Sequence, residues 1–355
     1  MRTTVLGATE PDEGANPIQR TVSDRGSRSV GGRVLVVHIS GGDLSSFVRR
    51  DADILRSSFS VTTLSFRGKF DIFSLARAVS QTDVVVCWFA WDNAFWSSLV
   101  APILGRRVVV IAGGFDVVSF PEIGYGNLLH AGSARRTRFA LRRADLVLAV
   151  SKSICKDAQL ASGRDDIRLV YHGFDETEFP LGEDKKRIAL TVGDVTESNL
   201  TRKGLKCFVD AARHAPDVRF LVVGRSDKKA VDLLGSLPKN VSLLGRLSDA
   251  DVRSVMKESQ VYVQVSAHEG FGCSLAEAML CGCIPVVTDR GALPEVAGET
   301  GFYVKYGDPH DTASGILEAI QAGESSSRAA RARISRLFPL GKRKEAVIDA
   351  VLEVM

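Results

Sequence analysis

The sequence has few of the residues that build metal centres and disulfide frameworks. Its 355 residues include six cysteines and six histidines, and no two cysteines form a CxxC pair. The single CxC, Cys281 with Cys283, falls where a helix is expected to end and a strand to begin. We therefore expect neither a zinc site nor a disulfide framework, and a reducing cytosol as the compartment.

Long apolar runs and nucleotide-cofactor fingerprints are also missing. The most apolar window, residues 84–105, is interrupted by Asp92 and Pro102, so it predicts a buried strand followed by a helix. Residues 1–32 are polar and lack the apolar core of a signal peptide, which favours a disordered tail. Because no GxGxxG is present, a dinucleotide cofactor is not expected.

Short runs rich in β-branched residues alternate with amphipathic segments along the rest of the chain. The expected strands are 33–39, 61–64, 84–89, 107–112, 146–150, 167–171, 187–193, 218–224, 241–245, 261–266 and 284–288. Near-continuous apolar strands separated by helices indicate parallel sheets covered on both faces. The series is interrupted at 173–186 by Gly, Pro and mixed charge, typical of a linker. We predict an α/β fold with two doubly wound domains, 33–172 and 187–337, that face one cleft, and a terminal helix over 338–355.

The stretch HEGFGCSLAEAM, residues 268–279, combines a glycine-rich turn with two glutamates. Glu269 follows an expected strand, at the carboxyl edge where such sheets bind ligands. The turn should leave the amides of Gly272 and Ser274 at a helix N-terminus, which suits phosphate oxygens. Ser274 and Glu277 also fit a capping box, which requires no ligand. A nucleotide-sugar would use both the amides and the carboxylates.

EGFGCSLAE resembles the E-x7-E signature of retaining glycosyltransferases of the GT-B fold, family 4. CGCIPVVTDRGALPEVAGETGFYV resembles the segment that follows it, and the similarity extends over most of the second half of the chain. The first half resembles the family in layout. The resemblance implies two Rossmann-like domains and transfer of a sugar from a UDP- or GDP-sugar to an acceptor hydroxyl, with retention. It implies no metal and no cofactor, the nucleotide-sugar being a substrate.

The resemblance also implies roles for individual residues. Glu269 would contact the donor sugar, and Glu277 the ribose hydroxyls. The other implied donor-binding residues are Gly270, Phe271, Gly272, Cys273 and Ser274 in the turn, Arg246 and Leu247 near the base, and Gly41 and Gly42 after the first strand.

Lys203 matches the family lysine that contacts the diphosphate, where cations stabilise the leaving group. Asp194 stands where an arginine is common, and we expect the neighbouring Arg202 to supply that charge. Arg202 and Lys203 could equally be an exposed helix start. Asp116 lies where many members carry a histidine. Asp116 could bind a sugar hydroxyl or serve as the base that deprotonates the acceptor. Equally, it could cap a turn.

Two basic and aromatic stretches bear on the partners. ARRTRFALRR (134–143) and WFAWDNAFW (88–96) favour a peripheral contact with the inner face of an anionic membrane, although a solvated face and a core are the plainer interpretations. The acceptor would then be a glycan, a lipid-linked intermediate or a small molecule, and no nucleic-acid partner is expected. The DxD sequences at 51–53 and 249–251 fall in expected helices, so no metal site is predicted. A silent nucleotide-sugar or glycan-binding protein and a sugar-nucleotide epimerase remain alternatives.

Overall fold

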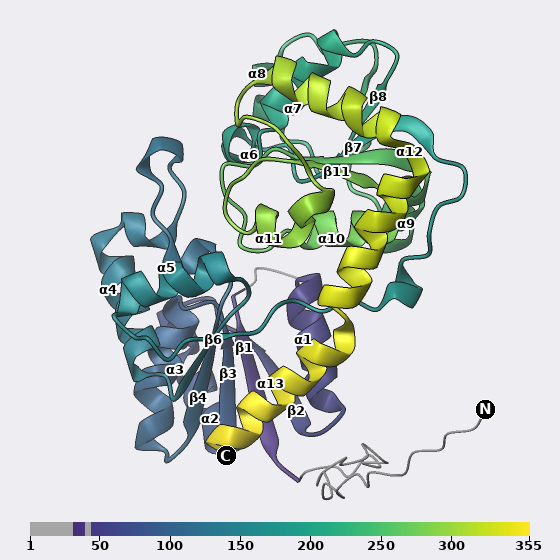
Figure 1. Ribbon diagram of the computed structural model, residues 1–355. Helices are drawn as coiled ribbons and strands as arrows, with labels where there is room; N and C mark the ends of the chain where they lie inside the picture. Colours follow the sequence, from purple (N-terminus) through teal and green to yellow (C-terminus); the bar gives the residue numbers. More distant parts are fainter. Residues whose placement is uncertain (1–30, 40–43) are drawn as a thin grey trace, which may run out of the picture.

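The computed structural model describes residues 31–39 and 44–355 of the chain. They form two α/β domains that face each other (Figure 1), so the predicted fold class is confirmed. The expected tail, residues 1–32, lies almost entirely outside the described residues, as do Gly41 and Gly42.

The first domain is built on a six-stranded parallel sheet in the order β2-β1-β3-β4-β5-β6. Its strands are β1 (Arg33–His38), β2 (Ser60–Ser65), β3 (Val84–Trp88), β4 (Arg107–Ala112), β5 (Leu146–Ala149) and β6 (Arg168–Leu169). The central strands β1, β3, β4 and β5 are buried along almost their whole length. Helices must therefore cover both faces of the sheet, as the continuous apolar runs predict.

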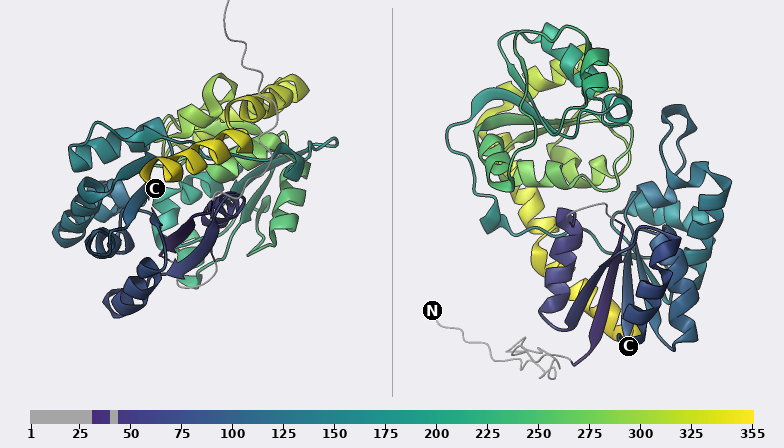
Figure 2. Two further views of the ribbon diagram at one scale, coloured as in Figure 1. Left: turned by 90° about the horizontal axis from the view of Figure 1, so that it is seen from below. Right: turned by 180° about the vertical axis from the view of Figure 1, so that it is seen from behind.

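The helices of this domain are α1 (Ser46–Arg56), α2 (Ile72–Ser80), α3 (Asp92–Ile103), α4 (Ala131–Arg143) and α5 (Lys152–Ser162). Helix α3 packs between α2 and α4, while α1 lies on the opposite face of the sheet (Figures 1 and 2). The apolar window 84–105 thus forms β3 and α3. In the described part of the chain, no helix combines the length and the apolar character that crossing a membrane requires.

The second domain repeats the plan with the parallel order β12-β11-β10-β7-β8-β9. Its strands are β7 (Lys186–Val192), β8 (Arg219–Val223), β9 (Val241–Leu243), β10 (Ser259–Gln264), β11 (Ile284–Val287) and β12 (Phe302–Tyr303). Its helices are α6 (Glu197–Arg202), α7 (Leu205–Ala211), α8 (Lys228–Leu234), α9 (Asp249–Glu258), α10 (Cys273–Leu280), α11 (Leu293–Ala297) and α12 (Pro309–Leu337), the last interrupted at Gly323.

The chain passes between the domains twice, and the two crossings are bonded to each other. The amide of Phe174 donates to the carbonyl of Phe338 at 2.9 Å, and the amide of Leu340 donates to the carbonyl of Phe174 at 2.9 Å. After the second crossing, α13 (Leu340–Val354) packs on α1 and β4 of the first domain (Figure 1). The last helix therefore belongs to the first domain in space.

A buried ion pair fixes α13 in this position. Both guanidinium nitrogens Nε and Nη2 of Arg343 lie 2.6 Å from the carboxylate oxygens of Asp51 in α1. Its remaining nitrogen donates to the carbonyls of Val170 and Tyr171, where the first crossing begins. Each side chain of the pair is only 1% exposed. One arginine thus joins α1, α13 and the linker.

We expect Arg343→Met to lower the free energy of unfolding by about 3–5 kcal/mol, because it leaves the Asp51 carboxylate buried without a counter-ion. Asp51→Leu/Arg343→Met removes the stranded charge and should recover about half of that loss, the carbonyls of Val170 and Tyr171 still lacking their donor. Urea unfolding measures both, with the exposed Lys342→Met as the matched control. Equal losses in the single and double variants would contradict this account.

Candidate functional site

The glycine-rich turn after β10 brings the second domain into close contact with the first. A Cβ on Gly270 would lie 2.1 Å from the carbonyl oxygen of Gly113 in the first domain, so only glycine fits there. Helix α10 then begins at Cys273, with Gly272 as its N-cap in the left-handed region (φ 98°) and no side-chain cap bond. The capping box expected for Ser274 and Glu277 is therefore wrong. Glu277 is left free for another role.

Glu269 stands at the start of this turn in a cluster of charge. Its Oε1 accepts from Lys203 Nζ at 3.1 Å and Ser266 Oγ at 3.0 Å, and Arg202 lies 3.7 Å away. Burial alone would raise the pKa of Glu269, but Lys203 and Arg202 outweigh it and lower the pKa to about 2. The carboxylate thus stays ionised, and the structure brings together three residues that the sequence singled out.

Local packing explains how the two cations reach Glu269. The carbonyl of Arg202 accepts from the amide of Ala267 at 2.7 Å, which ties the end of α6 to the end of β10. A Cβ on Gly204 would meet the carbonyl oxygen of Val265 at 2.2 Å, so this close approach requires glycine. The Lys203 side chain then passes over Gly193 toward the carboxylate. Arg202 and Lys203 are not an exposed helix start.

A hairpin of the first domain reaches the same cluster, although no motif in the sequence indicated it. The guanidinium of Arg202 lies 5.0 Å from the ring centroid of Tyr125, a cation–π contact. His268, beside Glu269, packs against Phe120 and Tyr125 with ring centroids 4.8 and 6.0 Å apart. Burial lowers the pKa of His268, so it is neutral at neutral pH. These aromatic side chains close one side of the cluster.

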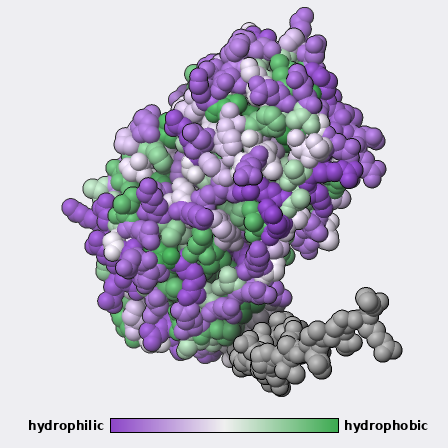
Figure 3. Space-filling model, in the orientation of Figure 1, coloured by the Kyte–Doolittle hydropathy of each residue, from purple (hydrophilic) through white to green (hydrophobic). Residues whose placement is uncertain are grey.

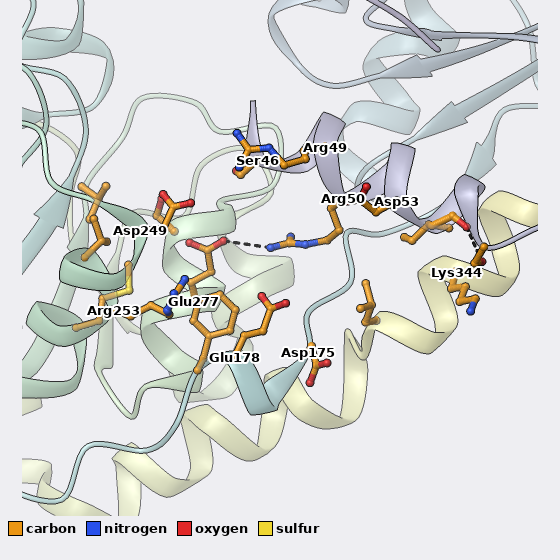
Figure 4. A pocket seen from close by; sticks show the side chains of 18 residues that line it. Ser46, Arg49, Arg50, Asp53, Asp175, Glu178, Asp249, Arg253, Glu277 and Lys344 are labelled. Carbon is orange, nitrogen blue, oxygen red and sulfur yellow. Dashed lines mark hydrogen bonds and ion pairs between the residues drawn. The ribbon is translucent and has the colours of Figure 1, made fainter. Parts of the chain in front are cut away.

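Glu277 faces a separate cavity of about 610 Å³ between α1, α9, α10 and the linker. Arg50 of α1 reaches across from the first domain to within 3.7 Å of its Oε1 (Figure 4). Burial raises the pKa of Glu277 to about 7, against the opposing effect of Arg50. Ser274, Asp249 and Arg253 also line this cavity. It has the size of a small-molecule site with convergent polar groups.

The other expected donor residues lie in three different settings. Phe271 is 3% exposed, and its ring packs with His172 and Phe338 at 5.1 and 5.2 Å, so only its backbone is available to a ligand. Burial raises the pKa of the Cys273 thiol to about 12, which leaves it protonated and unreactive. Arg246 is exposed and Leu247 half-buried. Neither lines the cavity as the described residues form it.

Two aspartates that depart from the family pattern hold backbone and side chains in place. Asp116 is fully buried and accepts from the amides of Ala90, Gly113 and Gly114 at 2.7–3.1 Å. Of the two roles weighed for it, capping a turn is the one observed, and its side chain is buried in this structure. Asp194 forms an ion pair with Arg225 at 2.7 Å.

Known proteins share both the second-domain sequence and the overall fold. The sequence profile of the family Glycosyl transferases group 1 matches residues 186–322. N-acetyl-alpha-D-glucosaminyl L-malate synthase of Bacillus anthracis is 24% identical over 264 residues, covering 68% of this chain and 66% of that protein. A phosphatidylinositol N-acetylglucosaminyltransferase subunit of Arabidopsis thaliana is 27% identical over 258 residues, covering 68% and 57%. The chain thus matches less than two thirds of either relative's length.

Solved structures extend the likeness to the first domain. Anabaena HepE in complex with UDP and glucose superposes with a TM-score of 0.75 at 19% identity, covering 91% of this chain and 100% of that one. Sucrose-phosphate synthase from Thermosynechococcus elongatus gives 0.71 at 17% identity, covering 91% and 98%. At such identities the likeness concerns the fold. The family profile thus matches the second domain, and the likeness of fold spans both domains.

Metal ligands are not gathered near the cleft in the described part of the chain. Across residues 31–39 and 44–355, no three His, Cys, Asp or Glu side chains are grouped so that they could hold a metal ion. The DxD at 51–53 lies in α1, where Asp51 is bound by Arg343, and that at 249–251 lies in the first turn of α9. The described cations near the turn are Arg202 and Lys203.

We expect Glu277→Gln to stabilise the fold at high pH while weakening donor binding. The folded pKa of Glu277, about 7, exceeds its usual value of 4.5, so the folded state favours the proton and wild-type stability declines as pH rises between these values. Glutamine carries no charge to bury, and the variant should gain about 1–3 kcal/mol over wild type at pH 8 and little at pH 4.5.

Unfolding at a series of pH values measures this gain. Glu258→Gln is the matched control, because Glu258 is half exposed and its hydrogen bond with Lys186 lowers the pKa. Parallel stability profiles for wild type and Glu277→Gln would show that the carboxylate is not held at an energetic cost.

Proposed function

We propose that this chain is a retaining glycosyltransferase of family 4, which moves a sugar from a nucleotide-sugar to an acceptor hydroxyl. The single observation that carries the proposal is the cluster of Glu269, Lys203 and Arg202 beside a glycine turn that leads into a helix N-terminus. The ribose would bind Glu277 in the adjacent cavity, and the diphosphate would lie near Lys203 and the first amides of α10.

The charge state of Glu269 favours a role as a hydrogen-bond acceptor. A carboxylate whose pKa is about 2 is a weak base and a weak nucleophile. It would accept bonds from hydroxyls of the transferred sugar and orient the anomeric carbon. Since no other described carboxylate lies in this cluster, a covalent intermediate has no evident nucleophile. We therefore favour front-face transfer, in which the leaving phosphate oxygen takes the acceptor proton.

Lys203 and Arg202 supply the electrostatic part of the mechanism. As the bond between the sugar and the diphosphate breaks, negative charge develops on the leaving oxygen, and cations already in place stabilise it without reorganisation. Ser266, Asn199 and Tyr125 hold the two cations and Glu269 in position. In this proposal Arg202, next to Lys203, supplies the positive charge of the family arginine, whose position Asp194 occupies here.

We expect Lys203→Ala to slow sugar transfer by about 10²–10³-fold, the loss seen when one donor to a developing oxyanion is deleted. Glu269→Gln should slow it to a similar extent, because it weakens the orientation of the sugar and removes the charge that holds Lys203 and Arg202. Lys206→Ala is the control, because that lysine is exposed on α7 and pairs with Asp210. Circular dichroism checks the fold, and NMR of the product shows the anomeric configuration. Near wild-type rates in both variants would eliminate the mechanism, and an inverted product would eliminate retention.

The donor is expected to be a UDP- or GDP-sugar. HepE has been solved with UDP-glucose, and a relative from Xanthomonas campestris, 24% identical over 268 residues, is named a GDP-mannose-dependent mannosyltransferase. In a thermal-shift screen, the cognate nucleoside diphosphate at about 100 times its Kd should stabilise the protein by about 2.7 kcal/mol. Glu277→Ala should abolish the shift. A shift without transfer to any acceptor in a panel would instead indicate a silent binding protein.

A further inference from the structure

Helix α2 has two apolar faces, and only one of them is used by the fold. Leu75 and Val79 point into the core and are fully buried. Phe73 and the preceding Phe70 are each 88% exposed, although burial of a phenylalanine is strongly favourable. Arg77, one turn after Phe73, is also exposed on this helix. Nothing in the fold of the described residues explains two bare aromatic rings so close together.

A groove lined by aromatic and basic side chains lies beside these rings. It has a volume of about 650 Å³ and runs between α3 and α4, with Lys69 at its edge next to Phe70. Phe95 packs against Trp96 and Phe139 with ring centroids 5.2 and 5.3 Å apart. Helix α3 packs against both α2 and α4, so the groove and the exposed rings form one continuous face.

This face is strongly basic. Segments 67–80, 92–103 and 131–143 together carry eight Arg and Lys and two Asp. One of these aspartates, Asp92, is paired with Arg136 at 2.7 Å. Within residues 31–39 and 44–355, no ion pair joins the exposed Arg135 or Arg138 to a carboxylate. The charges therefore remain available to an anionic partner.

We propose that this face, the α2–α4 surface formed by Phe70, Phe73, Arg77, Lys69, Arg135 and Arg138, docks on an anionic lipid bilayer. The phenylalanines would enter the interface between headgroups and acyl chains, and the basic side chains would lie against the phosphates. Figure 3 shows one side of the molecule, on which apolar residues of the first domain are interspersed with hydrophilic ones.

The size and shape of the patch favour a bilayer over a folded protein partner. Two phenylalanines bury on the order of 300–500 Å². A standard protein interface needs roughly 800 Å² on each partner, with an apolar centre and a polar rim. Here Phe70 lies just before α2 and Phe73 lies in its first turn, with Lys69 and Arg77 as the nearest basic residues along the chain. Such a pattern suits insertion into a fluid surface whose charge is opposite, and it is independent of the proposed transfer reaction.

Sedimentation of the full chain with lipid vesicles tests the proposal. We expect binding to vesicles of phosphatidylcholine mixed with phosphatidylglycerol, with at least about tenfold weaker binding to phosphatidylcholine alone or at high salt. Phe70→Ser/Phe73→Ser and Arg135→Ser/Arg138→Ser should each reduce binding about tenfold or more. These four side chains lie on the surface, so both variants should keep the wild-type thermal unfolding.

Leu233→Ser is the matched control, because Leu233 is an exposed apolar residue on α8 of the other domain. It should bind vesicles as the wild type does. The proposal is overturned if the wild type does not sediment with anionic vesicles, or if both double variants sediment with them as well as the wild type does. It is also overturned if the phenylalanine variant changes only the oligomeric state in gel filtration, since the patch would then be a contact between protein chains.

Discussion

The ion pair between Asp51 and Arg343 is the contact on which the geometry of the cleft depends. It joins residues 292 positions apart and holds α13, α1 and the first crossing together in a region from which water is excluded. Breaking such a pair from one side leaves a buried charge, so the pair makes one arrangement of these elements far better than others. Arg50, next to Asp51 on α1, forms an ion pair with Glu277 of the second domain. The placement of α1 therefore decides whether Arg50 can reach Glu277.

The two glutamates of the turn show how the surroundings divide one residue type into two roles. Glu269 has Lys203 and Arg202 at hand and stays ionised, with a pKa of about 2. Glu277 is as buried, but its ion pair with Arg50 is longer than that of Glu269 with Lys203, and burial raises its pKa to about 7. In the proposed reaction, the ionised Glu269 would lie beside the transferred sugar, whereas Glu277 would accept bonds from the ribose hydroxyls. A short turn and about one turn of helix are enough to separate them.

Much of the fold could be predicted, because strands and helices follow from local patterns. The apolar runs predicted all the described strands except the two-residue β12, and the order of glycines and glutamates in HEGFGCSLAE located Glu269. Contacts between distant segments could not be read in this way. Tyr125 beneath Arg202 and Arg50 opposite Glu277 depend on how the domains meet. The capping box predicted at Ser274 was wrong because it rests on a local pattern. Here Gly270 packs closely against Gly113 of the other domain, and Gly272 is the N-cap of α10.

Contacts between the domains are of two kinds, and the difference bears on how a donor could enter. At the crossings, Phe271 packs among Phe174, His172 and Phe338. Two backbone hydrogen bonds also join the first crossing at Phe174 to the second at Phe338 and Leu340. Across the cleft, Glu295 accepts from the amides of Lys152 and Ser153 at the start of α5, Arg202 lies over Tyr125, and His268 packs against the hairpin rings of Phe120 and Tyr125. Water can replace polar contacts at little net cost, whereas it cannot replace a packed aromatic cluster. The side of the cleft held by the Glu295 and Arg202 contacts therefore separates more readily than the crossings do. Glu269 lies on that side, next to Arg202.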